Sequence, residues 1–148
     1  MRLGQTLEAF ADADLVLLFR SENATERIRT ALDEIAAPDL VTLMIGADHG
    51  LTGTFEGPEG FIEAWRDYSE TFQELHNEAM EPVEVNSDVI YVETRQRGTT
   101  ATAGIEIDYT AAAIFRFSDG RLRQAEFQLD RDAARRVVGL EPDHPATD

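Results

Sequence analysis

The hydrophobic period of this chain changes about halfway along, and this change limits its fold more than any other feature. In the first half, apolar residues recur every three or four positions, as they do on one face of an α-helix. From Val83 onward they alternate or form short continuous runs, as they do in β-strands. Helices followed by strands indicate an α+β domain and argue against a doubly wound parallel sheet.

Three helices are predicted in the first half. The first spans roughly residues 4–20. The second begins at Asn23, an N-cap with Glu26 at capping-box spacing, and ends before Pro38. The third opens with Pro58 at its first position and has the strongest amphipathic pattern of the chain. Its apolar stripe is Phe61, Trp65, Tyr68, Phe72 and Leu75.

The strands predicted in the second half form an antiparallel sheet. They lie at 83–86, 88–97, 105–117 and 121–129, and residues 40–45 are either a further strand or a last helical turn. Residues 118–120 signal a tight hairpin, and Asp130 caps a short last helix that ends near Gly139. A curved sheet wrapped around the Trp65 helix would form a cone with an apolar interior, where small molecules commonly bind.

Composition excludes several classes of function. The chain has no cysteine, so it has no disulfide framework, thiolate metal site or cysteine nucleophile. Its 29 acidic and 13 basic residues give a net charge of −16, which repels nucleic acids and anionic membranes, and we expect neither as a partner. No apolar run is long enough to span a membrane, so a cytoplasmic protein is expected.

The length of the chain suits one domain. We expect residues 1–140 to form it and residues 141–148, which carry two prolines and no hydrophobic period, to be a flexible acidic tail. Eight acidic and no basic residues lie between Asp67 and Thr94. We interpret them as a solvated face, and no metal site is predicted because their spacing does not bring carboxylates together.

Four local motifs, in this order, resemble those of the SnoaL-like polyketide cyclases within the nuclear-transport-factor-2-like superfamily. Each motif alone is weakly specific, and the first 50 residues match only in helical character. The motifs are FEGPEGF at 55–61, RQRG at 95–98, AAIFRFSDGRL at 112–122, and LDRDAA at 129–134 followed by GL at 139–140.

The resemblance implies helices packed on a cone-shaped sheet, a homodimer, and acid/base chemistry without a cofactor on apolar cyclic substrates. A cyclase or isomerase fits this pattern better than an epoxide hydrolase. Phe127 stands where epoxide hydrolases of the superfamily keep an aspartate, and the nearest match to their Arg-x-Asp element is residues 95–97. Family members often have a histidine in the long strand, where this chain has Ala113.

The acid/base candidates are weak. His49, His76 and His144 lie in a loop, at a helix end and in the tail. Glu93 becomes a candidate general base if Tyr91 and Glu93 face into the cone, and otherwise it lies on the surface; the sequence leaves both alternatives open. Asp108 points outward unless a bulge reverses the faces of the long strand.

The candidate ligand-binding residues are mainly aromatic. Tyr109 and Phe115 lie on the more apolar face of the long strand, which should line the cone. Phe127 of the return strand is expected to face into the cone. Arg123 lies on the same face of that strand. If its guanidinium is inside the cone, it would bind a carboxylate or enolate oxygen; otherwise it reaches solvent at the end of the sheet. Trp65 is first a core residue, and the resemblance adds a place on the pocket wall.

Two hypotheses for the function follow. In the first, the chain binds or acts on an apolar cyclic ligand in the cone by cofactor-free acid/base chemistry. In the second, it is a non-catalytic module for dimerisation or ligand binding that has no active acid/base pair. They differ in whether a carboxylate or histidine projects into the cavity. Alanines at 111–113 would permit close packing of the outer sheet face against a partner.

Overall fold

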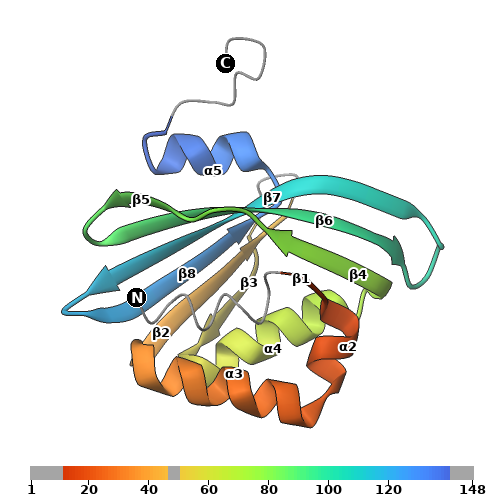
Figure 1. Ribbon diagram of the computed structural model, residues 1–148, viewed down its shortest axis with the longest axis horizontal. Coiled ribbons are helices and arrows are strands. Elements are labelled where there is room, and N and C mark those ends of the chain that lie inside the picture. The colour runs from red at the N-terminus through yellow and green to blue at the C-terminus, as the bar shows by residue number, and fades with distance from the viewer. Residues whose placement is uncertain (1–11, 47–50, 141–148) are drawn as a thin grey trace.

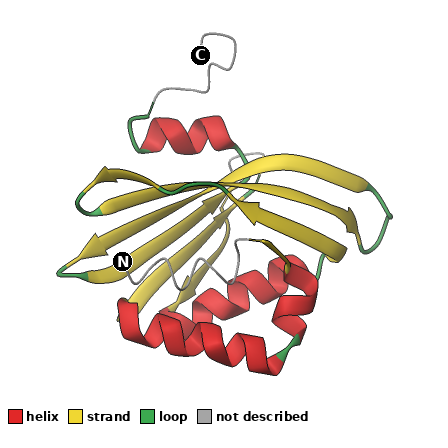
Figure 2. Ribbon diagram, viewed as in Figure 1, coloured by secondary structure: helices red, strands yellow, loops and turns green. Residues whose placement is uncertain are grey.

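The computed structural model describes residues 12–46 and 51–140. One curved sheet forms the centre, with helices beneath its concave face and the last described helix on the other side (Figure 1). Figure 2 shows this arrangement of helices and strands by colour. The predicted α+β class, with helices packed on a curved sheet, is confirmed.

The helices are α2 (Leu15–Arg20), α3 (Glu22–Ile35), α4 (Gly57–Ser69) and α5 (Arg131–Val137). The strands are β1 (Asp12–Asp14), β2 (Ala36–Ile45), β3 (Leu51–Glu56), β4 (Phe72–Ala79), β5 (Val83–Asn86), β6 (Val89–Thr100), β7 (Glu106–Ser118) and β8 (Arg121–Gln128). The sheet order is β1-β4-β6-β7-β8-β2-β3, and β5 pairs with β6. None of the described helices is long and apolar enough to cross a membrane.

The helix starts differ from the predictions in two places. Of the predicted helix at 4–20, residues 4–11 lie outside the described residues, residues 12–14 are a strand, and only α2 is helical. The N-cap of α3 is Ser21 rather than Asn23, because the Ser21 hydroxyl accepts the Ala24 N–H at 3.1 Å. Both residue types cap helices well, and the backbone at Ser21 is extended as a cap requires.

Strand β2 begins earlier than expected, directly after α3. Residues 40–45 belong to this strand and not to a helical turn. Pro38 therefore lies within β2, where the parallel register with β8 is interrupted between Ala36 and Val41. A proline has no N–H for a sheet ladder, so an interrupted register is where it is tolerated.

The prediction that α4 carries Phe72 and Leu75 is wrong. The helix ends at Ser69, and both residues belong to β4. Their spacing of three residues is typical of a helix, and here it occurs in a strand whose register with β6 shifts between Phe72 and Glu74. This irregularity lets Phe72 and Leu75 both enter the main core, although a regular strand would alternate them.

The second half of the chain folds closely as predicted. The turn at Asp119 and Gly120 has positive φ at both residues, 55° and 75°, as a tight hairpin requires. The connection between the strands predicted at 88–97 and 105–117 is shorter than expected, since β6 continues to Thr100. The Asp130 carboxylate caps α5 by accepting the Ala133 N–H at 3.1 Å, and Gly139 follows with φ 79°.

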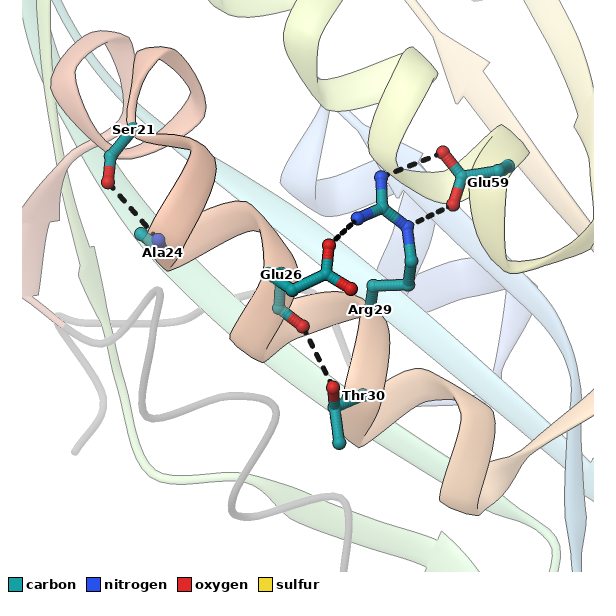
Figure 3. Close-up of polar contacts among 6 residues, drawn as sticks. All are labelled: Ser21, Ala24, Glu26, Arg29, Thr30 and Glu59. Carbon is teal, nitrogen blue, oxygen red and sulfur yellow. Dashed lines mark hydrogen bonds and ion pairs between the residues drawn. The ribbon is translucent and has the colours of Figure 1, made fainter.

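An arginine joins α3 to α4 under the sheet (Figure 3). The Arg29 guanidinium donates to both oxygens of Glu59 on α4 and also contacts Glu26 one turn away on α3. This hydrogen bonding raises the pKa of Arg29 and lowers the pKa of Glu59 from their ordinary values. The contacts are exposed, so they orient the two helices more than they stabilise the fold.

Helix α5 covers part of the outer face of the sheet. Its Ala134 packs in a second buried cluster with Tyr91 of β6 and with Ala112 and Ile114 of β7. The outer face at Ala112 is therefore closed by this chain's own helix. The expected homodimer stays a prediction, and its interface would have to lie beside α5 or replace it.

Arginine 135 holds α5 in place. Its Nη1 donates to Glu93 at 2.8 Å, and its guanidinium lies 5.7 Å from the ring centroid of Tyr91. Replacing Arg135 with Ala would leave the Glu93 carboxylate half-buried with fewer partners. We expect Arg135→Ala to lower the free energy of unfolding by roughly 1–2 kcal/mol in urea denaturation.

The neighbouring exposed arginine provides the control. Arg136→Ala removes the same charge without a contact to Glu93, and should leave the free energy of unfolding nearly unchanged. Equal losses in the two variants would show that the Arg135–Glu93 contact does not hold the helix.

Candidate functional site

A cavity of about 390 Å³ lies between α4 and the concave face of the sheet. This volume falls within the usual range for small-molecule sites. Its apolar wall comes from many elements, so it exists only in the folded chain. The wall includes Phe55 of β3, Phe61 and Trp65 of α4, Val92 of β6, Phe115 of β7 and Phe127 of β8.

The hollow arises because small and large side chains meet across the sheet. Ala113 of β7 pairs directly with Phe127 of β8, and Ala111 lies two residues away on the same face. Their methyl groups leave space beside the Phe127 ring. That ring packs edge-to-face on Trp65 at 4.6 Å and on Phe115 at 5.9 Å between centroids, which fixes the shape of the wall.

A chain of hydrogen bonds forms the polar end of the cavity. The Tyr68 hydroxyl of α4 donates to Gln96 Oε1 of β6 at 2.7 Å, and Gln96 Nε2 donates to Asn77 Oδ1 of β4 at 3.0 Å. The Tyr109 hydroxyl of β7 contacts the Tyr68 hydroxyl. Because an amide oxygen only accepts, the single hydroxyl proton of Tyr68 goes to Gln96, and Tyr109 donates to Tyr68.

The tyrosines of this chain of hydrogen bonds stay protonated at neutral pH. Burial is the main cause that raises the pKa of Tyr68 well above its usual value, and its contact with Tyr109 raises that pKa further. Burial also raises the pKa of Tyr109. Neither hydroxyl is therefore a base at neutral pH, and the Tyr68 hydroxyl both donates to Gln96 and accepts from Tyr109.

Neither candidate acid/base residue lines the cavity. The β6–β7 register runs from Val89 to Thr99 without a bulge, so the two faces of these strands are fixed. Glu93 faces outward, where it accepts hydrogen bonds from Tyr91 at 2.8 Å and from Arg135 at 2.8 Å. This resolves the alternative left open by the sequence: Ile90 and Val92 face the main core, and Tyr91 and Glu93 do not.

Asp108 also lies on the outer face, as the pattern of the long strand predicts. Its carboxylate accepts two hydrogen bonds from Arg95, at 3.0 and 2.8 Å. This partner lowers the pKa of Asp108 below its ordinary value, so the group stays charged and paired. It is suited to bridging β6 and β7 rather than to proton transfer in the cavity.

The five candidate ligand-binding residues fall into three groups. Trp65, Phe115 and Phe127 line the cavity, and Tyr109 supports its polar end through Tyr68. Arg123 lies outside it, with Nη1 3.1 Å from Asp39 Oδ1, because the guanidinium reaches out from the sheet end. A role in ligand binding stays a prediction for each of them.

The histidines add no acid/base group among the described residues of the wall. His49 and His144 lie outside the described residues. His76 contacts Asp12 at 2.7 Å between β4 and β1, away from the cavity. The described part of the chain also contains no cluster of three or more metal-ligating side chains.

Sequence reasoning missed several polar residues of the cavity wall. Asn77 and Gln96 are each 2% exposed, and Asp67 lies in the wall with an exposed side chain. Gln96 follows Val92 and Thr94 at spacing two, which marks it as inward once the strand face is known. Asn77 carried no comparable signal, because β4 itself was not predicted.

The burial of all three tyrosines of the chain leads to a prediction on pH. The pKa of Tyr91 is raised like those of Tyr68 and Tyr109, mainly by burial. A tyrosine whose pKa is raised in the folded chain stabilises the fold while it is protonated. This contribution is fully present below about pH 10, the pKa of tyrosine in the unfolded chain, and is lost as the pH rises above that value. Phenolate absorbance should therefore appear only together with alkaline unfolding, followed by circular dichroism. Phenolate absorbance near pH 10 with intact circular dichroism would contradict the burial described.

Comparisons with known proteins agree with this fold. A candidate SnoaL-like polyketide cyclase from Jannaschia sp. CCS1 is 19% identical, with a TM-score of 0.58 and 94% of each chain covered. A protein of ketosteroid isomerase-like fold from Catenulispora acidiphila DSM 44928, in complex with trimethylamine, is 13% identical, with a TM-score of 0.58 and 92% and 93% covered. TerC, co-crystallised with polyporic acid, is 17% identical, with a TM-score of 0.53 and 91% and 98% covered.

No curated protein matches the chain. The family model of the SnoaL-like domain matches residues 7–125, which is most of the sequence. Together with the helices under a curved sheet, this match shows that the chain belongs to the SnoaL-like family, within the nuclear-transport-factor-2-like fold.

Proposed function

We propose that this SnoaL-like chain binds a ring-bearing, largely apolar small molecule in the cavity, with a polar atom of the ligand at the Tyr68 end. The observation that carries this proposal is the combination of a ligand-sized apolar hollow with one buried chain of hydrogen bonds. Such sites bind mainly through apolar contact and orient the ligand by a few polar groups.

The walls of the cavity favour a flat ring over a flexible chain. Phe127 and Trp65 lie nearly perpendicular to each other at 74°, and a third ring, Phe115, lies at 82° to Phe127. Aromatic side chains arranged in this way offer edges and faces to another ring. A ring also loses little conformational freedom when it is bound.

Binding is better supported than conversion of the ligand. Glu93 and Asp108 are paired with arginines on the other face of the sheet. The tyrosines at the polar end hold their protons, so the described wall offers Asp67 as its one carboxylate. The cyclase-type name of one structural neighbour, the trimethylamine complex of a second and the co-crystallisation of a third with polyporic acid are in keeping with a ligand site.

The test uses 4-tert-butylphenol as the probe and the intrinsic fluorescence of the protein as the readout. Trp65 is the only tryptophan of the chain and lies in the cavity wall. We expect saturable changes in Trp65 emission on titration with the probe. Thr94→Phe, which places a ring in the cavity, should abolish this response, because Thr94 lines the hollow.

The matched control is Thr110→Phe, on the outer face of β7 opposite Arg95. It introduces the same side chain outside the cavity, and its titration should resemble that of the wild-type chain. A wild-type chain without a saturable response, or equal binding by Thr94→Phe, would refute the proposed site.

A further inference from the structure

The described cavity wall carries a negative charge and no positive one. Among the described wall residues, Asp67 is a carboxylate and none is an arginine or histidine. Asp67 lies on α4 next to Tyr68, has an exposed side chain, and makes no hydrogen bond or ion pair with another described residue. Its negative charge is therefore available to a molecule that enters the cavity.

The aromatic wall adds to this preference. Ring faces carry partial negative charge and attract cations, and tryptophan does so most strongly. Trp65, Tyr68 and Phe127 form one contiguous set, with Trp65 5.8 Å from Tyr68 and 4.6 Å from Phe127 between ring centroids. A positive group in this hollow would meet ring electrons where an anion would be repelled.

The tyrosine hydroxyls at the polar end of the cavity donate their protons within the protein. The proton of Tyr68 goes to Gln96 and that of Tyr109 goes to Tyr68, so neither hydroxyl has a proton left to donate to a ligand. An anionic group would meet the Asp67 carboxylate and would receive no hydrogen bond from either tyrosine hydroxyl. The net charge of −16 acts in the same direction, because a cleft with low-dielectric walls focuses the field of the whole protein.

We infer that the ligand is a cation: a quaternary ammonium or protonated tertiary amine on a ring-bearing apolar body, recognised by Asp67 and the rings of Trp65, Tyr68 and Phe127. This inference rests on the proposed function and adds the charge of the ligand to it. Its positive group lies toward Asp67, and its apolar body fills the hollow beside Phe127.

The test compares three phenols of similar shape that differ in charge. They are (4-hydroxyphenyl)trimethylammonium, its neutral isostere 4-tert-butylphenol, and the anion 4-hydroxybenzenesulfonate. Each is titrated into the full chain at low salt and slightly below neutral pH, and the dissociation constant is obtained from Trp65 emission. We expect the ammonium to bind about tenfold more tightly than the neutral isostere, and the sulfonate to bind most weakly.

Two variants separate the local charge from the total charge. Asp67→Asn should reduce the preference for the ammonium to about threefold or less, with little change in the binding of 4-tert-butylphenol. Glu63→Gln removes one negative charge from an exposed position of the same helix outside the wall, and should keep the tenfold preference. Thermal unfolding of both variants confirms that they fold.

The outcomes distinguish this inference from the proposed function. If 4-tert-butylphenol binds as tightly as the ammonium or more tightly, the inference is overturned and the proposed function stands. If Asp67→Asn keeps the full preference, recognition by Asp67 is wrong. If none of the three phenols binds, the proposed function fails and the inference fails with it.

Discussion

The unbroken antiparallel pairing of β6 with β7 decides which side chains reach the cavity. Eleven successive pairs, from Val89 to Thr99 on β6, show no register shift. Because side chains of a strand alternate between faces, one inward residue fixes all the others. Val92 and Gln96 therefore face α4, while Glu93 and Asp108 face away. The chemistry available to a ligand follows from this register more than from the composition of the strands.

The two faces of the sheet are stabilised by different means. The concave face combines rings with the methyl groups of Ala111 and Ala113, and this mismatch in size leaves the hollow. The outer face is closed by α5 through Ala134 and the Arg135–Glu93 ion pair. Glu93 and Asp108 on the outer face are thus paired with arginines, while the described cavity wall contains no basic side chain.

Much of the fold could be predicted because its signals are local. The Asp119–Gly120 turn and the Asp130 cap each depend on a few neighbouring residues, and both formed as expected. Strand β4 could not be predicted, because its bulge gives Phe72 and Leu75 the spacing of a helix. The prediction of which face of the long strand points inward was correct for the same local reason, because the apolar residues of that strand alternate regularly.

The candidate site was less predictable because it depends on contacts between distant segments. The hydrogen bonds from Tyr68 to Gln96 and from Gln96 to Asn77 join α4, β6 and β4. The β6–β7 register turns Glu93 outward, and α5 supplies its arginine partner from 42 residues away. Aromatic residues of the wall were found from their spacing, whereas the polar residues were found only once the strands were in register.

The proposed ligand site is the hollow beneath β6 and β7. The most direct measurement is a crystal structure of the protein grown with 4-tert-butylphenol. We expect electron density for the phenol ring in the hollow beside Phe127, under Ala111 and Ala113, with the Tyr68–Gln96–Asn77 hydrogen bonds intact. The proposed site would be contradicted if Phe127 moved into the hollow and closed it, with the phenol bound elsewhere or not at all.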